Sequence, residues 1–317
     1  MDTQKIIVAI LVWIWIGQSA TAQPDSVKQV LDSSIALLRT HALHRQRPDW
    51  DYVRERAYEL AGEATRWEDL GPAISWLFQA VDDYHGRLII GNTMLGWKRT
   101  EPPFLSEALK EESAKGNRIV RMLLSGGIGY LRIQGMIKDG LLDSLAGLEA
   151  DGARALIIDL RLATDATISS TLEGLSPLLG NGYFIGNADC TGRILDMTKV
   201  EAPKGRHKLS TGTPVVVLTG HGTGRAGECI AVAFRGRQHT VFIGEPTAGY
   251  TTSGKGYSIV SGQVKIVLAE TMLADRNHRT YPRNLIPDEW VPGGDDLSDY
   301  SKDKKIQAAI SWLRDFH

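Results

Sequence analysis

Cysteine is scarce in this sequence: only Cys190 and Cys229 occur among 317 residues. Cys229 falls within a predicted helix among apolar neighbours, which is typical of a small core residue and does not favour a disulfide bridge to Cys190. An excess of positive charge is also absent, because 36 lysines and arginines accompany 37 aspartates and glutamates, for a net charge of −1. This balance excludes the basic surface that a nucleic-acid partner requires.

Metal-binding patterns are absent as well. His221 and Glu228 are seven residues apart, and no third ligand type lies near them at a usual spacing. We therefore expect no metal, and the composition of 43% hydrophobic and 23% charged residues indicates a globular protein with a proper core.

Long hydrophobic runs are scarce as well. Its one marked run, residues 6–16, follows Lys5 and precedes the small-residue site Ala20-Thr21-Ala22. This run is too short to span a bilayer, and the pattern predicts a secretory signal peptide over 1–22. The alternative is a permanent N-terminal anchor. The prediction is an exported protein, periplasmic or extracellular, without a stable membrane anchor.

Hydrophobic periodicity divides the remaining chain into three parts. Apolar residues recur at helical spacing between 23 and 84, which predicts three amphipathic helices and a helical N-terminal cap over 23–100. Residues 87–126 are expected to be irregular apart from a helix-like run at 105–115, and 101–126 is predicted to be a linker. Residues 127–317 form the predicted core.

The core alternates predicted strands and helices, which indicates an α/β fold with a sheet buried on both faces. The expected strands are 129–133, 153–160, 214–219 and 240–244; the expected helices are 139–152, 169–179, 226–235 and 304–316; and 257–260 with 264–270 form a late hairpin.

A glycine-rich corner at 222–227 lies between a strand and a helix. Gly222, Gly224 and Gly227, followed by Glu245 after the next strand, match the outline of a dinucleotide-binding fingerprint. That unit lies late in the chain, however, and an exported protein has little access to nicotinamide cofactors, so no cofactor is expected. Under either interpretation, the free amides of a helix N-terminus stabilise negative charge here.

Several motifs occur in an order that resembles the C-terminal processing (tail-specific) serine peptidases across roughly 127–288. They are Gly-Tyr-Leu-Arg-Ile at 129–133, Asp-Leu-Arg at 159–161, the corner at 215–228, Gly-Glu-Pro-Thr-Ala-Gly at 244–249 and Pro-Asp at 287–288. The resemblance implies a crotonase-like spiral of strand-strand-helix units. It also implies a serine nucleophile three residues before the corner glutamate, with a lysine base after the Gly-Glu-Pro-Thr-x-Gly loop.

The segment before the core adds one weaker likeness. Asp82-Asp83-Tyr84-His85-Gly86 resembles the Asp-x-His element of the same family, although His85 is also well explained as a hydrogen-bonded structural histidine. Many relatives insert a PDZ-type peptide-binding domain after this element. The segment 87–126 is too short for one.

The sequence departs from the family at each catalytic position. Counting back three from Glu228 gives Arg225, which has no usable lone pair and stays protonated near neutral pH. Tyr250 stands at the base position, and its phenol ordinarily titrates near 10. Where relatives carry glycines that shape the oxyanion donors, this chain has Asp165 and Ala166. Loss of one such donor costs about 3 kcal/mol in known cases.

These substitutions suggest that Asp165 and Arg225 form a salt bridge that plugs the former active site, since both would face one pocket. The alternative is that Arg225 points to solvent or pairs with Glu228 one turn along. Four residues could rescue hydrolysis: Ser253, Lys255, Thr223 and His221.

The resemblance therefore implies a secreted homologue of the tail-specific peptidases that is catalytically impaired and binds a peptide or small ligand. The cleft would involve Gly222, Gly224, Gly249 and His85. The alternative is an active serine-type peptidase with a relocated nucleophile.

Overall fold

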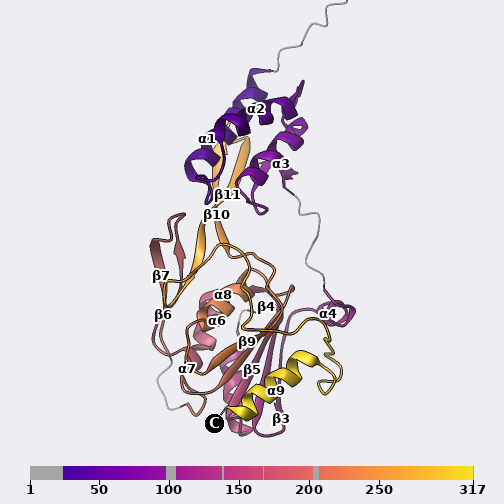
Figure 1. Ribbon diagram of the computed structural model, residues 1–317, viewed down its shortest axis with the longest axis vertical. Helices are drawn as coiled ribbons and strands as arrows, with labels where there is room; N and C mark the ends of the chain where they lie inside the picture. The colour runs from indigo at the N-terminus through magenta and orange to yellow at the C-terminus, as the bar shows by residue number, and fades with distance from the viewer. Residues whose placement is uncertain (1–23, 98–104, 138, 167, 203–206, 317) are drawn as a thin grey trace, which may run out of the picture.

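The computed structural model describes residues 24–97, 105–137, 139–166, 168–202 and 207–316. Figure 1 shows an elongated molecule, with a helical cap at one end and a sheet covered by helices at the other. The predicted signal peptide lies outside the described residues.

A mostly parallel sheet forms the body of the core. Its strand order is β13-β9-β8-β5-β4-β3, and only β3 runs antiparallel to its neighbour. The strands span Arg118–Leu124 (β3), Ile128–Ile137 (β4), Ala155–Ala166 (β5), Val215–Thr219 (β8), Thr240–Gly244 (β9) and Glu289–Trp290 (β13).

Helices bury both faces of this sheet, as the continuous apolar strands predict. One face packs against α5 (Leu141–Ala150), α6 (Ile168–Gly174), α7 (Ser176–Leu179) and α8 (Ala226–Phe234). The other face packs against the C-terminal helix α9 (Lys304–Asp315) through Ile306, Ala309 and Leu313. Neighbouring strand residues alternate between the two faces: Val217 contacts the first set of helices and Val216 contacts the second.

A second, antiparallel sheet links the core to the cap. Its main order is β2-β1-β11-β6-β7, and β10 and β12 also pair with β11. The strands span Arg87–Ile90 (β1), Thr93–Gly96 (β2), Gly182–Ala188 (β6), Ile194–Val200 (β7), Thr252–Ile259 (β10), Val264–Asp275 (β11) and Thr280–Tyr281 (β12). The β10–β11 hairpin therefore belongs to the core in sequence but extends into the cap (Figure 1).

The cap consists of α1 (Asp25–His41), α2 (Trp50–Ala61), a short 3₁₀ helix (Trp67–Leu70) and α3 (Gly71–Ala80). Asp49 starts α2 by accepting hydrogen bonds from the Asp51 and Tyr52 amides. The apolar faces of the helices bury β1 and the far half of the hairpin, including Val264 and Ile266. The cap is thus completed by strands that come from the core.

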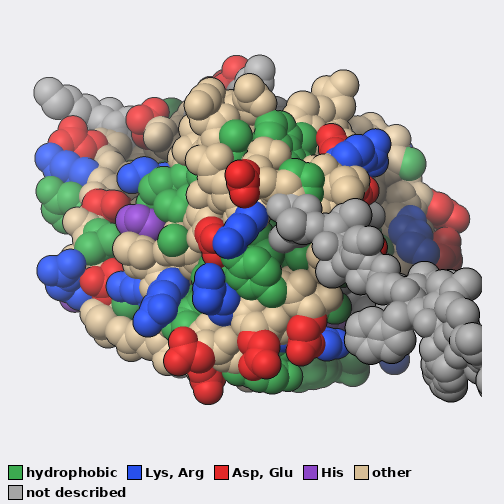
Figure 2. Space-filling model, turned by 90° about the horizontal axis from the view of Figure 1, so that it is seen from above, with side chains coloured by type: hydrophobic (Ala, Val, Ile, Leu, Met, Phe, Trp, Pro, Cys, Tyr) green, Lys and Arg blue, Asp and Glu red, His purple; other side chains and the backbone are tan. Residues whose placement is uncertain are grey.

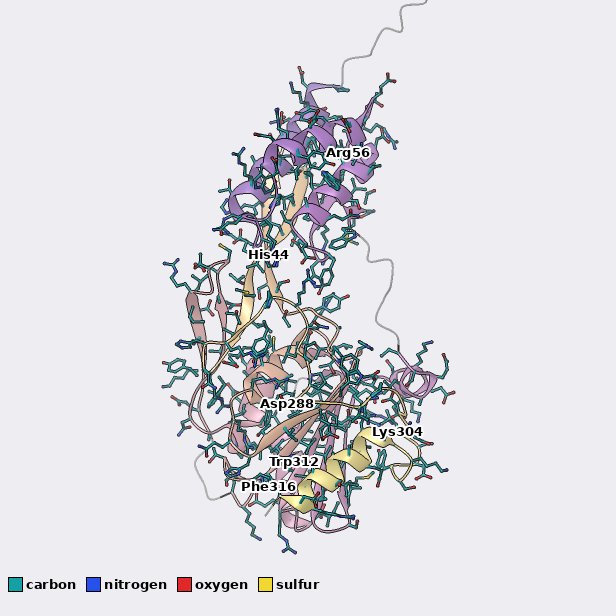
Figure 3. All side chains as sticks on the ribbon, in the orientation of Figure 1. His44, Arg56, Asp288, Lys304, Trp312 and Phe316 are labelled. Atoms are coloured by element: carbon teal, nitrogen blue, oxygen red, sulfur yellow. The ribbon has the colours of Figure 1, made fainter. Side chains whose placement is uncertain are left out.

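Side-chain views add detail to this arrangement. His44 lies where the cap meets the hairpin (Figure 3), next to Leu43, whose amide donates to the Ala269 carbonyl at 2.8 Å. Figure 2 shows acidic and basic side chains next to one another over the cap end of the molecule, in agreement with the balanced charge. Within the described ranges, no helix is both long and apolar enough to cross a membrane.

The structure confirms the expected α/β fold, the three cap helices, the late hairpin and the terminal helix. It differs at 87–126, expected to be irregular apart from one helix, where β1, β2 and β3 form in addition to α4 (Glu107–Ser113). These strands are short or lie at a sheet edge, so they lack a continuous apolar run. The single helix expected at 169–179 is two short helices, because Pro177 starts α7. The domain boundaries stay predictions.

Candidate functional site

The corner between β8 and α8 holds Arg225 in a strained conformation. Arg225 is the N-cap of α8, with φ 46° and ψ −108°, a backbone region that side chains with a Cβ rarely adopt. The corner runs directly against β5, since a Cβ added at Gly222 would lie 2.3 Å from the Arg161 carbonyl oxygen. At Gly227 it would lie 2.1 Å from the Ala163 oxygen. The glycines are therefore needed for this close packing.

Glu245, which the dinucleotide-binding interpretation would assign to a ribose, has other partners. Its carboxylate lies 3.0 Å from the Lys305 ammonium and accepts from the Gly293 amide. The glycine pattern is thus explained by strand-to-helix packing.

The Glu228 carboxylate joins the corner to the 244–249 loop by hydrogen bonds to both. One carboxylate oxygen accepts from the Thr247 hydroxyl at 2.5 Å and the Gly249 amide at 2.7 Å. The other accepts from the amides of Tyr250 at 2.6 Å and Arg225 at 3.1 Å. Burial raises the pKa of this carboxyl to about 7, although the four donors act to lower it. The Glu228 carboxylate thereby fixes the backbone on both sides of the site.

Three aromatic rings stack beside the corner. The Tyr250 and His85 ring centroids are 4.2 Å apart, and those of His85 and Tyr84 are 4.0 Å apart. The Arg225 guanidinium carbon lies 5.7 Å from the centre of the Tyr250 ring. The Tyr84 hydroxyl donates to the Gly249 carbonyl, which also lies 3.4 Å from His85 Nε2. The cap thus places His85 next to the corner of the core.

Asp83 fixes the segment that carries His85. Its carboxylate accepts from the amides of His85 at 3.1 Å, Gly86 at 2.8 Å and Ala269 at 2.7 Å. Burial raises the pKa of Asp83, against the lowering effect of these three donors. Because Ala269 lies on β11, this carboxylate joins the cap to the hairpin.

Two adjoining cavities open at this site. The larger, with a volume of about 410 Å³, is lined by polar and apolar side chains from the cap, the corner, α6 and the β10–β11 hairpin. The smaller, of about 280 Å³, lies toward β2 and Trp97. Four residues line both: His85, Arg87, Arg225 and Tyr250.

The structure brings together most of the residues predicted for the site. The larger cavity is lined by Arg225, Tyr250, His85 and Ser253. The Gly249 carbonyl accepts a hydrogen bond from Tyr84, one of the three aromatic residues beside the corner. Gly224 lies close to Tyr250. The Asp165 and Ala166 backbones pair with β4, but their side chains lie outside the described residues. The proposed Asp165–Arg225 salt bridge therefore stays a prediction.

Three rescue candidates lie outside the described lining of both cavities. Thr223 is fully buried, and its hydroxyl donates to the Leu160 carbonyl at 2.8 Å and accepts from the Gly220 amide at 3.1 Å. Lys255 lies farther along β10, with its ammonium 5.3 Å from the centre of the Tyr257 ring. His221 is absent from the described lining of both cavities.

Sequence reasoning missed two lining residues. Arg87 was missed because its segment was expected to be irregular. In β1, successive side chains alternate between the two faces of the sheet, and this alternation directs Arg87 to the cavity. Cys229, four residues after Arg225, reaches the cavity from α8, and burial raises the pKa of its thiol to about 12. Both cysteines are free in the structure.

Comparison with known proteins identifies a family for this fold. The model of peptidase family S41 matches residues 127–290, slightly more than half of the chain. The nisin-resistance protein of Lactococcus lactis subsp. lactis is 26% identical over 178 residues, which are 53% of this chain and 52% of that protein. The chain thus matches about half the length of this curated relative.

Solved structures share the fold at low sequence identity. A putative peptidase from Parabacteroides merdae has a TM-score of 0.70 at 18% identity, covering 90% of this chain and 96% of that one. A lipoprotein from Streptococcus agalactiae has a TM-score of 0.60 at 16% identity, with coverage of 92% and 97%. The photosystem II D1 C-terminal processing protease has a TM-score of 0.59 at 14% identity, with coverage of 88% and 96%.

Proposed function

This chain belongs to peptidase family S41, and from that premise we propose that it binds a peptide or small ligand without hydrolysing it through a serine. The observation that carries the proposal is Arg225 at the N-cap of α8, beside an open cavity of about 410 Å³. The cleft is retained, and the residue at its reactive corner offers no nucleophilic atom.

The chemistry of the corner supports impaired hydrolysis. A guanidinium has no usable lone pair at neutral pH, so it can neither attack a carbonyl carbon nor accept a proton from water. A positive charge at a helix N-terminus is also unfavourable by about 0.3–1 kcal/mol. What the corner can do is attract an anionic or polar group of a bound ligand.

The rival function is an active serine-type peptidase, and Ser253 is the observation in its favour. Its side chain lines the same cavity, although its hydroxyl donates at 3.3 Å to Asn187 on β6. Cys229 also lines the cavity, but a thiol with a pKa of about 12 carries almost no thiolate at neutral pH.

We propose further that the protein is exported, to the periplasm or the extracellular space. The charged, apolar and small-residue segments of 1–22 support this localisation. A neighbour in structure is itself described as a lipoprotein. Fractionation of cells that produce the full-length chain tests the proposal: a processed protein outside the cytoplasm supports it, and an unprocessed cytoplasmic protein contradicts it.

A fluorophosphonate probe separates binding from hydrolysis. We expect no labelling of the purified protein, while labelled peptides still bind and are recovered intact by mass spectrometry. Labelling that disappears in Ser253→Ala would establish the rival function. Ser298→Ala is the matched control, because Ser298 is an exposed serine whose hydroxyl donates to Asp296, away from the cavity lining as described.

A further inference from the structure

The β10–β11 hairpin changes its packing partners along its length. Its far half, including Ile266, packs in one apolar cluster with the cap helices. Its near half, including Met272, packs in another cluster with Ala188 of β6. The pairing register shifts between Ser253 and Gly254, where these two halves meet. Because a β-bulge bends its strand locally, this position is the expected bending point between the cap and the core.

Asp82 connects the cap to a loop of the core. Its carboxylate lies 3.3 Å from the guanidinium of Arg47, in the loop between α1 and α2, and it also pairs with Arg283, in the loop after β12. The Arg283 carbonyl accepts a hydrogen bond from Thr251, which lines the larger cavity. We call the two ion pairs of Asp82 the Asp82 latch. Both arginine side chains are more than half exposed, so each ion pair is weak and easily opened.

His44 lies beside the Asp82 latch, where the cap meets the hairpin (Figure 3). Together with Asp82, Asp83 and His85, it lines a small cavity closed on the other side by hairpin residues. Within the part of the chain that the structure describes, the His44 ring has no hydrogen-bond or ion-pair partner. The preceding residue, Leu43, packs in the apolar cluster of the near half of the hairpin. The His44 loop is thus a contact of the cap with the core.

The groups around His44 determine the direction of its pH response. Burial and then Arg47 lower the pKa of His44 from 6.5, Asp82 acts to raise it, and Arg283 acts to lower it. The released junction therefore binds the proton more tightly, and the latched junction loses stability as pH falls below 6.5. Asp83 acts in the opposite direction, because burial raises its pKa. The described charged or titratable groups facing His44 are Arg47, Asp82, Asp83, Tyr84, His85 and Arg283.

A second histidine of the cap has a different environment. His41 Nδ1 lies 3.6 Å from the Glu270 carboxylate on β11, and its ring centroid lies 4.8 Å from that of Tyr257 on β10. Protonation of His41 strengthens its contact with Glu270. Acid therefore keeps α1 on the hairpin while it weakens the contact at His44.

We propose that the cap and the far half of the hairpin turn together about the bulge, and that protonation of His44 releases them from the core. An imidazolium at this position competes with Arg283 for the single Asp82 carboxylate and repels both guanidinium groups of the latch. His85, three residues after Asp82, moves away from the corner when the cap turns. The junction is then a pH-sensitive switch that holds the cleft in its closed arrangement at neutral pH.

Hydrogen exchange of the purified full-length chain at pH 5.0 and 7.5, corrected for the intrinsic rate, tests this switch. The Leu43 amide reports on the junction, because it donates to the Ala269 carbonyl next to the bulge at 2.8 Å. The paired amides of β1 and β11 at 87–90 and 264–267 report on the cap itself. We expect exchange at Leu43 to be about tenfold faster at pH 5.0, as for a one-unit difference in pKa between the two states, with the cap amides unchanged.

Substitutions assign the effect to the junction. His44→Gln should remove the pH difference at Leu43, since the other titrating groups are shared by both proteins and cancel in the comparison. His239→Gln is the matched control, because His239 is an exposed histidine that packs on Phe316 at the core end of the molecule (Figure 3). Asp82→Asn should exchange fast at both pH values, and asparagine tolerates the positive φ of residue 82.

Three results overturn the switch. The first is a pH difference that persists in His44→Gln with thermal unfolding like that of the unsubstituted protein. The second is slow exchange at Leu43 in Asp82→Asn at pH 7.5, which decides the matter even where His44→Gln does not fold. The third is faster exchange at 87–90 and 264–267 at pH 5.0, because the cap would then unfold instead of turning. Ligand binding does not enter these measurements, so none of the three bears on the proposed function.

Discussion

Glu228→Gln is the substitution with the most sharply defined consequence for stability. The two Glu228 carboxylate oxygens each accept two hydrogen bonds, from groups on both sides of the corner. Glutamine has nearly the same volume, but its NH₂ group would replace an oxygen that faces two donors. An unsatisfied buried donor costs about 1–3 kcal/mol, so two of them predict a loss of about 2–6 kcal/mol relative to the ionised carboxylate, the form present at pH 8.

The loss should depend on pH in a defined direction. The folded-state pKa of Glu228 is about 7 and its ordinary value is 4.5, so the folded protein binds a proton here that the unfolded chain has released. The unsubstituted protein therefore loses stability as pH rises from 4.5 through about 7, by roughly 3 kcal/mol at about 1.4 kcal/mol per pKa unit. Glutamine does not titrate. The destabilisation caused by Glu228→Gln should accordingly be about 3 kcal/mol smaller at pH 8 than at pH 5.

Urea unfolding followed by tryptophan fluorescence at pH 5, 6, 7 and 8 measures this difference. All other titrating groups are shared by the two proteins and cancel when their free energies of unfolding are subtracted. Glu107→Gln is the control, because Glu107 is exposed on α4 and should change stability by less than about 0.5 kcal/mol at every pH. A destabilisation that grows with pH would refute the reasoning, because it would mean that the four donors outweigh burial.

Three further experiments test separate parts of the structure. Arg225→Ser with Asp165→Gly should gain fluorophosphonate labelling, and adding His85→Ala should slow that labelling by about 100-fold or more, because His85 lines the same cavity as residue 225 and can act as a base; labelling that persists without His85 assigns the base elsewhere. Asp83→Asn should lower the free energy of unfolding by about 1–3 kcal/mol in thermal or urea unfolding, since its NH₂ would face a backbone amide; an unchanged midpoint would contradict this. Arg237→Met should cost about 3 kcal/mol or more, because it removes the guanidinium donors from the carbonyls of four residues, Leu178, Ser210, Thr213 and Gln238. Hydrogen exchange around residue 237 would show no change if these hydrogen bonds were unimportant.

The core could be predicted from sequence because its strands are buried on both faces. Continuous apolar runs such as 153–160 have no other stable place in a globular chain, and the order of the motifs predicted which strands meet at the corner. Arg225 and Tyr250 line one cavity for the same reason, and their assignment to the catalytic positions stays a prediction. The cap sheet could not be predicted, because β1 and β2 are four residues each and their hairpin joins the larger sheet through the pairing of β1 with β11, far away in the sequence.

The same non-local pairing explains which site residues were missed. Arg87 enters the cavity only because β1 pairs with β11, from Arg87 opposite Val267 to Ile90 opposite Val264. His85 is placed by Asp83, whose carboxylate bonds the Ala269 amide on the same distant strand. The local motif at 82–86 pointed to His85, but no local pattern indicates that Arg87 faces the same cavity. Arg87 depends on a contact between distant segments, and sequence reasoning could not assign it for that reason.

The strained corner also decides how a restored serine can be interpreted. A positive φ at a non-glycine residue costs roughly 1–2 kcal/mol, and nothing in the arginine side chain requires it. The surrounding structure imposes this backbone conformation. Gly222 and Gly227 pack closely on β5, and the Glu228 carboxylate accepts a hydrogen bond from the Arg225 amide. Because those constraints do not involve the side chain at 225, Arg225→Ser should leave the corner backbone unchanged. Activity gained or not gained by that variant therefore reports on the chemistry around the corner and not on its shape.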